Sequence, residues 1–431
     1  MSGKKDVFAL QALLPTLDWV SAPETLEGNA IGDYRPSLVA APKSPAQVAQ
    51  LLRTADEREY RIRIWYGTPN IGAFVPDHAD TVILDMKKID QVLEYDPDNL
   101  TVTVQLGCTL ASLQSCLRES GQWLPLESPE PGKCYLGGIL AANVSGPRRL
   151  LYGTARDLVL GMEMALVNGD IIRGGGRTMK NVAGYDLCRL FIGSMNTLGV
   201  MTTATFRLLP VPAETKSLLA LFERSGDAFA FTRELCGGFL FPAAVEILDG
   251  LPQGVDFPVR EGSILVATLL EGSGSVVDRQ LQVTCEIARK HKCNSTCVLQ
   301  NEQGRLLWSI LARNGAPPSD GSEVCLRIGV PPTRLPEVWN LFGSMEASRQ
   351  SRAGVGLLYV TMPTAHTSWL EECRKEVTAM EGYLVVSRGP QSLQSLSRVW
   401  REDDEEPRIM RALRDQFDPR RTLVGAFGTS K

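Results

Sequence analysis

Histidine is scarce in this sequence, and long apolar runs and an excess of basic residues are missing. Only three histidines occur among 431 residues, and none is paired at the spacing of metal ligands. No run approaches the roughly 20 apolar residues that a membrane-spanning helix needs. The formal net charge is -4, whereas nucleic-acid-binding proteins carry basic patches. The sequence therefore predicts no metal site, no transmembrane segment and no nucleic-acid partner.

A disulfide framework is also missing. The ten cysteines are scattered without regular spacing, which is typical of reduced thiols in the cytosol. One cluster, "HKCNSTC" with His291, Cys293 and Cys297, matches no common zinc pattern, and we interpret it as ordinary thiols near a turn. The amino terminus begins with basic residues, but its apolar part is short and no small-residue cleavage site follows. We therefore expect an unprocessed cytoplasmic protein.

The first half of the sequence alternates helix and strand patterns. Ser44 is expected to cap a helix with apolar residues at helical spacing, and the strand "RIRIWYG" follows that helix. Thr109 is expected to cap a second helix, which Gly121 ends. Asn168-Gly169-Asp170 joins two apolar runs, and this predicts a β-hairpin.

From about residue 213, apolar strands alternate with helical patterns. "SLLALF", "SILVATLL", "EVCLRIGV" and "VGLLYVTM" are strand candidates, and "SVVDRQLQVTCEIARK" and "SWLEECRKEVTAM" are helix candidates. This rhythm predicts an antiparallel sheet covered by helices. We expect a second α+β domain at 213–406 and a tail at 407–431, which contains a helix and a turn at Asp418-Pro419.

Three segments rich in small residues share one chemistry. They are "YGTPNIG" at 66–72, "GGILAANVSG" at 137–146 and "GSMNTLG" at 193–199. Their glycines beside Ser, Thr or Asn allow backbone N–H groups to point at an anion such as a phosphate. None matches the dinucleotide fingerprint G-x-G-x-x-G or the phosphate loop that ends in Gly-Lys-Ser/Thr. A Rossmann fold and a P-loop NTPase are therefore disfavoured.

The region from Pro42 to about Pro212 resembles a known family. The phrases that carry the resemblance are "SGPRR…YG…RDLVLG", "MKNVAGYDL" and "GS…TLGV". In combination they resemble the FAD-binding domain of the vanillyl-alcohol oxidase and p-cresol methylhydroxylase (PCMH) type. Within that group the sequence looks most like the FAD-binding subunit of bacterial glycolate oxidase, and "FDPRRTLVGAFG" is similar to the tail of these proteins.

The resemblance implies an α+β fold in which two small subdomains clasp FAD. The FAD-binding domain would occupy 36–212, after an amino-terminal extension at 1–35, and the tail would return to it. The implied cofactor-binding residues are Tyr66, Gly67, Thr68, Pro69, Asn70, Gly72, Gly137, Gly138, Asn143, Ser145, Gly146, Gly193, Ser194, Leu198, Gly199 and Val200. Arg156 and Asp157 are expected to brace the site as a charged pair. The alternative is tight packing between two subdomains without a ligand.

Two departures from the family pattern concern the segment at 66–72, which corresponds to the family's pyrophosphate loop. It has fewer glycines than that loop, and Pro69 removes one N–H donor. It also contains neither the His nor the Cys to which covalent members attach flavin. We therefore expect any FAD to bind non-covalently. Its affinity is expected to be lower than is usual in the family, or else FAD does not bind.

Candidates for the chemistry are few. Oxidation of a 2-hydroxy acid needs a base for the hydroxyl proton and a hydride acceptor, with cationic groups on the carboxylate. His366 follows a strand and precedes a helix, so it is the candidate base; the alternative is a surface residue beside a helix cap. Arg327 and Arg388 are candidate carboxylate ligands at strand ends, or else solvated charges. Single-chain relatives carry a His pair with a Glu in the second domain, and the lack of that pair argues against a complete site.

The resemblance implies the FAD-binding subunit of a glycolate oxidase-like complex. A sister flavoprotein would carry the 2-hydroxy acid site. An iron–sulfur subunit would receive the electrons, because this chain lacks the cysteine spacing of its own cluster. Any membrane association would arise through these partners. Two alternatives stay open: a self-sufficient FAD-dependent oxidoreductase of another small alcohol or acid, and a structural or regulatory subunit that has lost FAD.

Overall fold

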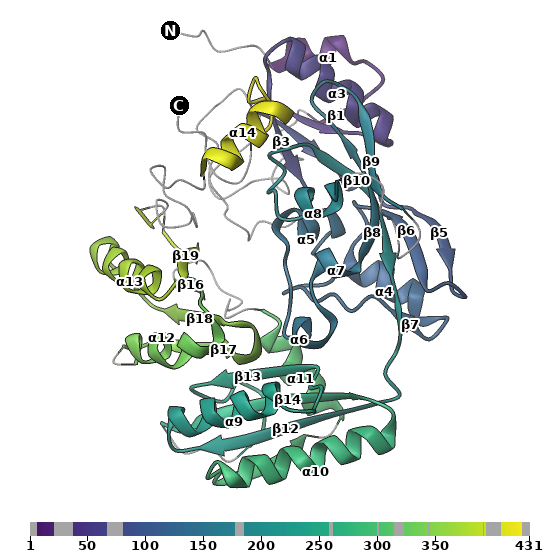
Figure 1. Ribbon diagram of the computed structural model, residues 1–431. Helices are drawn as coiled ribbons and strands as arrows, with labels where there is room; N and C mark the ends of the chain where they lie inside the picture. The colour runs from purple at the N-terminus through teal and green to yellow at the C-terminus, as the bar shows by residue number, and fades with distance from the viewer. Residues whose placement is uncertain are drawn as a thin grey trace.

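The protein has two halves, each built on β-sheet and each with its own hydrophobic core (Figure 1). The computed structural model describes residues 7–20, 38–66, 81–176, 185–257, 262–299, 301–313, 323–343, 345–390, 392–393 and 407–424. Two smaller sheets share one core in the amino-terminal half, and one large sheet has a core on each face in the carboxy-terminal half. The predicted α+β fold, with two subdomains followed by a second α+β domain, is confirmed.

The first small sheet is mixed and is covered by helices. Its strands, in the order β1-β2-β4-β3, are β1 (Asp18–Val20), β2 (Val39–Ala41), β4 (Thr81–Asp85) and β3 (Arg61–Trp65). The two helices are α1 (Val7–Leu13) and α3 (Pro45–Glu57). Ser44 caps α3 as predicted, because its side chain accepts a hydrogen bond from the Gln47 backbone. Residues 7–20, which the sequence treats as part of an extension, add α1 and β1 to this layer.

The second small sheet is antiparallel. Its strands, in the order β5-β6-β10-β8-β9, are β5 (Val92–Asp96), β6 (Thr101–Gln105), β10 (Val200–Arg207), β8 (Val159–Ala165) and β9 (Ile171–Gly175). The helices that accompany it are α4 (Leu110–Arg118), α5 (Leu136–Ala142), α6 (Arg149–Tyr152), α7 (Ala155–Leu158) and α8 (Leu187–Phe191). A two-stranded ribbon of β7 (Gln122–Trp123) and β11 (Leu209–Pro210) lies beside them. The hairpin predicted at Asn168–Asp170 joins β8 to β9, and Thr109 caps α4.

The large sheet is antiparallel, as the sequence predicts, and has eight strands among the described residues. In the order β15-β12-β14-β13-β17-β18-β16-β19, they are β15 (Ser295–Leu299), β12 (Glu214–Phe222), β14 (Ile264–Gly272), β13 (Ala244–Leu248), β17 (Ser348–Arg352), β18 (Leu357–Met362), β16 (Val324–Gly329) and β19 (Tyr383–Arg388). One face packs against α9 (Ser225–Gly237), α10 (Gly274–Lys290), α12 (Leu335–Leu341) and α13 (Thr367–Ala379). Helix α11 (Asn301–Leu311) covers part of the opposite face. The rest of that face carries the polar residues described below.

The last described segment returns to the first small sheet (Figure 1). Helix α14 (Pro407–Phe417) ends on Phe417, whose ring packs edge-on against Phe191 at 5.6 Å. Leu423 then forms a parallel bridge with Ile62 at the free edge of β3. Asp418 accepts hydrogen bonds from the Thr422 and Leu423 backbone and so shapes the turn before this bridge. The boundaries at 36–212, 213–406 and 407–431 stay predictions.

Candidate cofactor site

Two of the three small-residue segments lie side by side. The Gly193 N–H donates to the Leu140 carbonyl at 2.9 Å, and the Met195 N–H donates to the Ala141 carbonyl at 2.9 Å. The turn after α8 is thus attached to the carboxyl end of α5. Gly193 has a φ of +87°, and an added Cβ there would lie 3.5 Å from the Cβ of Asn143. The structure therefore brings Asn143, Gly193 and Ser194 together, as the resemblance implies.

Three polar atoms at this junction are buried and have no hydrogen-bond partner in the described part of the chain. They are Asn143 Oδ1, Ser194 Oγ and Asn196 Oδ1. Asn143 and Asn196 have φ values of +49° and +59°, so the backbone adopts the left-handed conformation at both. A buried polar group without a partner costs about 1–3 kcal/mol, and few native sites tolerate three together. The junction therefore fits a ligand with hydroxyl and N–H groups, such as the ribityl chain, flavin and adenine of FAD.

Neighbouring protein atoms leave no room for a side chain at Gly137 and Gly199. A Cβ on Gly137 would lie 2.0 Å from Cε1 of Tyr66, whose hydroxyl donates to the Met201 carbonyl at 2.6 Å. Burial raises the pKa of the Tyr66 phenol, so it stays a neutral donor. A Cβ on Gly199 would lie 2.9 Å from the Ala165 carbonyl oxygen. The contacts of both glycines with FAD stay predictions.

The remaining residues of the implied site divide into three groups. Leu198 and Val200 are buried in the amino-terminal core, and Gly138 lies half-buried in α5. Ser145 and Gly146 are buried where the two halves of the chain meet; a Cβ on Gly146 would lie 2.3 Å from Glu127 Oε2. The segment from Gly67 to Gly72, with Thr68, Pro69 and Asn70, lies outside the described residues.

The predicted pair of Arg156 and Asp157 is replaced by two separate contacts. Arg156 Nη2 donates to the Ile192 carbonyl at 2.8 Å, next to Gly193. The Asp157 carboxylate accepts from the backbone and hydroxyl of Thr154 and completes a capping box at α7. Arg156 thus braces the turn at 193–196, and Asp157 has a local role in a helix start.

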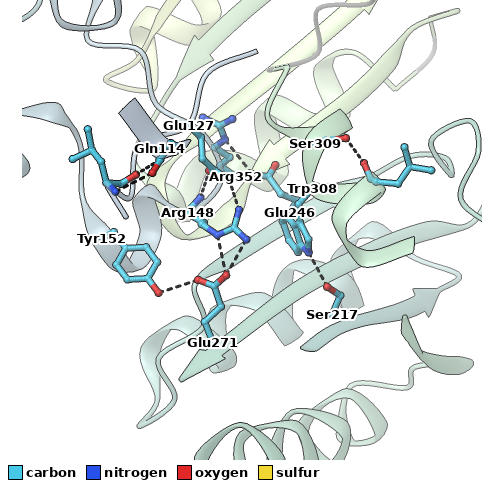
Figure 2. A network of polar contacts seen from close by, with 12 residues as sticks. Gln114, Glu127, Arg148, Tyr152, Ser217, Glu246, Glu271, Trp308, Ser309 and Arg352 are labelled. Atoms are coloured by element: carbon cyan, nitrogen blue, oxygen red, sulfur yellow. Dashed lines mark hydrogen bonds and ion pairs between the residues drawn. The ribbon is translucent and has the colours of Figure 1, made fainter. Parts of the chain in front are cut away.

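A buried ion pair joins two strands of the large sheet (Figure 2), and its arginine also contacts the loop at 143–146. Arg352 on β17 donates to Glu246 Oε1 on β13 at 3.0 Å and to the Ser145 carbonyl at 2.7 Å. The two side chains are 2% and 0% exposed. Burial raises the pKa of Glu246 to about 7, although the charge of Arg352 opposes this shift. Arg352 remains charged and fixes the loop by a contact that crosses between the halves.

The raised pKa of Glu246 predicts a pH-dependent stability. The folded state holds the proton more tightly than the unfolded state, so this contribution is full below pH 4.5 and is lost as the pH rises through about 7. From pH 5 to pH 8, the free energy of unfolding should fall by about 2 kcal/mol more in the native protein than in Glu246→Gln. Urea unfolding of both proteins at several pH values measures this difference. A constant difference across the range would show that Glu246 does not titrate there.

A second polar network lies beside the first (Figure 2). The Arg148 guanidinium contacts Glu127 Oε1 at 2.5 Å and Glu271 Oε1 of β14 at 2.8 Å. The Tyr152 hydroxyl donates to Glu271 Oε2 at 2.9 Å. Burial opposes the charge of Arg148, but the two carboxylates raise its pKa. The network therefore joins the loop before α6 to the large sheet.

The histidine and arginine candidates for chemistry are dispersed. His366 is exposed and begins α13, on the face of the large sheet opposite to Arg352 and Glu246. Arg327 of β16 lies on the same face as Arg352, and Arg388 pairs in register with Cys325 at the end of β19. His291 contacts Glu234 at 2.7 Å. The structure does not bring His366 to the junction of 143 and 194, and its role as a base stays a prediction.

Within the described ranges, no group of three or more His, Cys, Asp and Glu side chains is arranged to hold a metal ion. In the same ranges, no helix has the length and apolar character to cross a membrane.

Comparisons with known proteins identify the amino-terminal region. The family described as "FAD binding domain" matches residues 36–175. Residues 36–175 are therefore similar to an FAD-binding domain. Glycolate oxidase subunit GlcD of Bacillus subtilis is 38% identical over 245 residues, which are 53% of this chain and 52% of that protein. Glycolate oxidase subunit GlcE of Escherichia coli is 39% identical over 150 residues, 35% of this chain and 43% of that protein.

The fold of the whole chain is also shared. A structure of p-cresol methylhydroxylase with substrate bound superposes with a TM-score of 0.72 at 17% identity, and covers 98% of this chain and 95% of that one. The chain spans about half the length of the curated relatives that it matches. The resemblance to the PCMH-type flavoproteins, and FAD as the cofactor of the domain, are confirmed by these findings.

The unpartnered hydroxyl of Ser194 leads to a prediction about the FAD-binding domain. Without FAD, Ser194→Ala should leave the free energy of unfolding unchanged or raise it by about 1 kcal/mol, because a buried group without a partner is removed. The same change should weaken FAD binding by about tenfold, since one hydrogen bond is lost. Flavin fluorescence titration measures the second effect and urea unfolding the first.

Thr268→Val is a matched control for Ser194→Ala. Thr268 on β14 also has a buried hydroxyl without a partner, and it lies in the large sheet. Its replacement should affect stability in the same direction and leave the affinity for FAD unchanged. Equal FAD affinities of Ser194→Ala and the native protein would remove Ser194 from the cofactor site.

Proposed function

We propose that this chain is the flavin-carrying subunit of a complex that oxidises a small 2-hydroxy acid and passes the electrons through FAD to an iron–sulfur partner. The observation that carries the proposal is the junction of Asn143, Ser194 and Asn196, where three unpartnered polar atoms lie at the contact between the region that matches an FAD-binding domain and the turn at 193–196. The similarity to glycolate oxidase subunits supports the substrate class and the subunit role. A sister flavoprotein and a cytoplasmic location are parts of the proposal.

The residues of this chain would bind and orient the cofactor. Asn143, Ser194 and Asn196 would hydrogen-bond to it, and the contact from Arg352 to the Ser145 carbonyl would hold the neighbouring loop in place. Oxidation of a 2-hydroxy acid to a 2-oxo acid removes the hydroxyl proton and a hydride from C2. When FAD is bound, it supplies the two-electron acceptor for that hydride.

Among the described residues, no histidine lies at the junction to accept the hydroxyl proton; His78 falls outside them. His366 is exposed at the start of α13, and His291 is paired with Glu234 near the other end of the large sheet. Neither histidine lies with the residues that meet the FAD-binding loops. We therefore assign the proton-accepting step to the complex, and His366 remains a candidate only if the chain acts alone.

Anaerobic reduction of the flavin tests the proposal. The purified chain, supplied with FAD, should show the visible absorption of oxidised flavin, and glycolate or D-lactate alone should not bleach it. Addition of the partner subunits should permit bleaching. Bleaching by the chain alone would favour the self-sufficient oxidoreductase. No flavin absorption even with excess FAD would favour the structural subunit and contradict the proposal.

A further inference from the structure

Two arginines near the loop at 143–149 form no ion pair with any described carboxylate. Arg149 of α6 donates from Nη1 to the Ser145 hydroxyl at 3.1 Å. Arg327 of β16 lies over the Tyr383 ring, and its Cζ is 5.9 Å from the ring centroid. The Nε of Arg327 is buried and has no hydrogen-bond partner among the described residues. Within the described part of the chain, neither guanidinium is neutralised.

The two arginines approach one another from opposite halves of the chain. Arg327 pairs in register with Tyr359 of β18, so both side chains lie on one face of the large sheet. Arg352 shares that face, because its guanidinium lies over the Tyr359 ring at 5.1 Å. The contact from Arg352 to the Ser145 carbonyl brings this face against the loop that carries Arg149. Burial, with repulsion from Arg352 and Arg327, lowers the pKa of Arg149.

The carboxylates near this contact face other arginines. Glu246 is hydrogen-bonded to Arg352, and Glu127 and Glu271 are paired with Arg148. Arg149 and Arg327 have no such facing carboxylate among the described residues, and both side chains are half-buried. A guanidinium binds one carboxylate through two parallel N–H···O bonds. A monocarboxylate therefore satisfies one arginine and leaves the other to repel its neighbours, whereas a dicarboxylate satisfies both.

We propose that Arg149 and Arg327 form an anion subsite for a 2-hydroxy dicarboxylate, rather than for a monocarboxylate such as glycolate or lactate. The inference that the bound acid is oxidised rests on the proposed function, but the binding of the dianion does not. Tyr359 and Tyr383 supply hydroxyl groups on the same face of the sheet. They are available to donate to the carboxylates or to the 2-hydroxyl group.

Matched pairs of acids test the subsite. Tartronate is glycolate with a second carboxylate, and malate is lactate with a second carboxylate. Isothermal titration of the full chain, loaded with FAD at constant ionic strength, should give about tenfold or tighter binding for the dicarboxylate of each pair. Arg327→Gln and Arg149→Gln should each abolish most of this preference and change monocarboxylate affinity little. Arg327→Lys, which keeps the charge but loses the fork of donors, should be intermediate.

Arg173→Gln is the control variant, because Arg173 is 82% exposed on β9 and pairs with Glu163. It should retain the full preference. Equal affinities for tartronate and glycolate in the native protein, or no binding of either, would overturn the subsite. If the preference is found but no 2-hydroxy acid bleaches the flavin with partners present, the subsite stands and the proposed oxidation fails. If glycolate bleaches the flavin and binds as tightly as tartronate, the proposed function stands and the dianion subsite fails.

Discussion

Arg148→Met is expected to lower the free energy of unfolding by about 3–5 kcal/mol. The Arg148, Glu127 and Glu271 side chains are 20%, 11% and 3% exposed. Water can therefore hydrate the two carboxylates only slightly once the guanidinium is removed. Methionine fills the space of the arginine stem but leaves two carboxylates of the same sign close together. The Tyr152 hydroxyl and the residue 148 backbone still donate one hydrogen bond to each carboxylate, and these bonds limit the loss.

Urea unfolding of Arg148→Met measures this loss, with Arg173→Met as the comparison. The Arg173 side chain is 82% exposed, and removal of its ion pair with Glu163 should cost under about 1 kcal/mol. A similar small loss for both variants would mean that the Arg148 network contributes no more than a surface pair. Because Arg148 and Glu271 belong to different halves, a separate unfolding transition of each half in Arg148→Met would also identify the network as their coupling.

Gly137→Ala is expected to destabilise the protein by at least about 3 kcal/mol, in the upper part of the range for over-packed sites. The new Cβ would lie between 2.0 and 2.5 Å from three atoms of the Tyr66 ring. The ring is buried and held by its hydrogen bond to the Met201 carbonyl. The backbone cannot retreat easily either, since the Gly137 N–H donates to the Leu106 carbonyl at 2.8 Å.

A double-mutant cycle separates this clash from any general effect on α5. In a Tyr66→Ala background the ring is gone, and Gly137→Ala should then cost less than about 1 kcal/mol. Gly132→Ala is the control, because nothing lies within 4 Å of the new Cβ there. If Gly137→Ala costs the same in both backgrounds, the glycine is required for a reason other than the tyrosine, and contact with FAD phosphates becomes the better explanation.

The local elements could be read from the sequence because each has a short-range cause. Ser44 and Thr109 mark helix starts by their side-chain hydrogen bonds, and the turn at Asn168–Asp170 closes on itself. The antiparallel sheet is predicted from four apolar runs that alternate with helical patterns, and the structure adds four further strands to it. The cofactor was accessible only through the resemblance of several phrases in combination, since the unpartnered atoms of Asn143 and Ser194 depend on contacts between distant segments.

The charged residues were the part that the sequence did not reveal. Glu246 lies within "AAVEILDG" and Glu271 precedes the final glycine of "LVATLLEG", and both apolar runs predict a strand without identifying a partner for the acid. Arg352, the partner of Glu246, is 106 positions away in the sequence. The sequence signal for such a site is an acidic residue within an apolar strand. A charge in that position is rarely buried without a partner, so the pattern predicts a buried ion pair.

The return of the chain to β3 has a consequence for synthesis. The Thr422 hydroxyl contacts Asp56 across 366 positions of sequence, and the Leu423 bridge completes the edge beside Ile62. At about 5–20 residues per second, the ribosome needs roughly 20–70 s to make the intervening chain. Throughout that interval one edge of β3 lacks its neighbour, and an open strand edge invites pairing with another chain. The first small sheet contains the earliest strands of the chain and is therefore the last sheet to be completed. Its open edge at β3 can pair with other chains, and so aggregate, for longer than the edges of the other sheets.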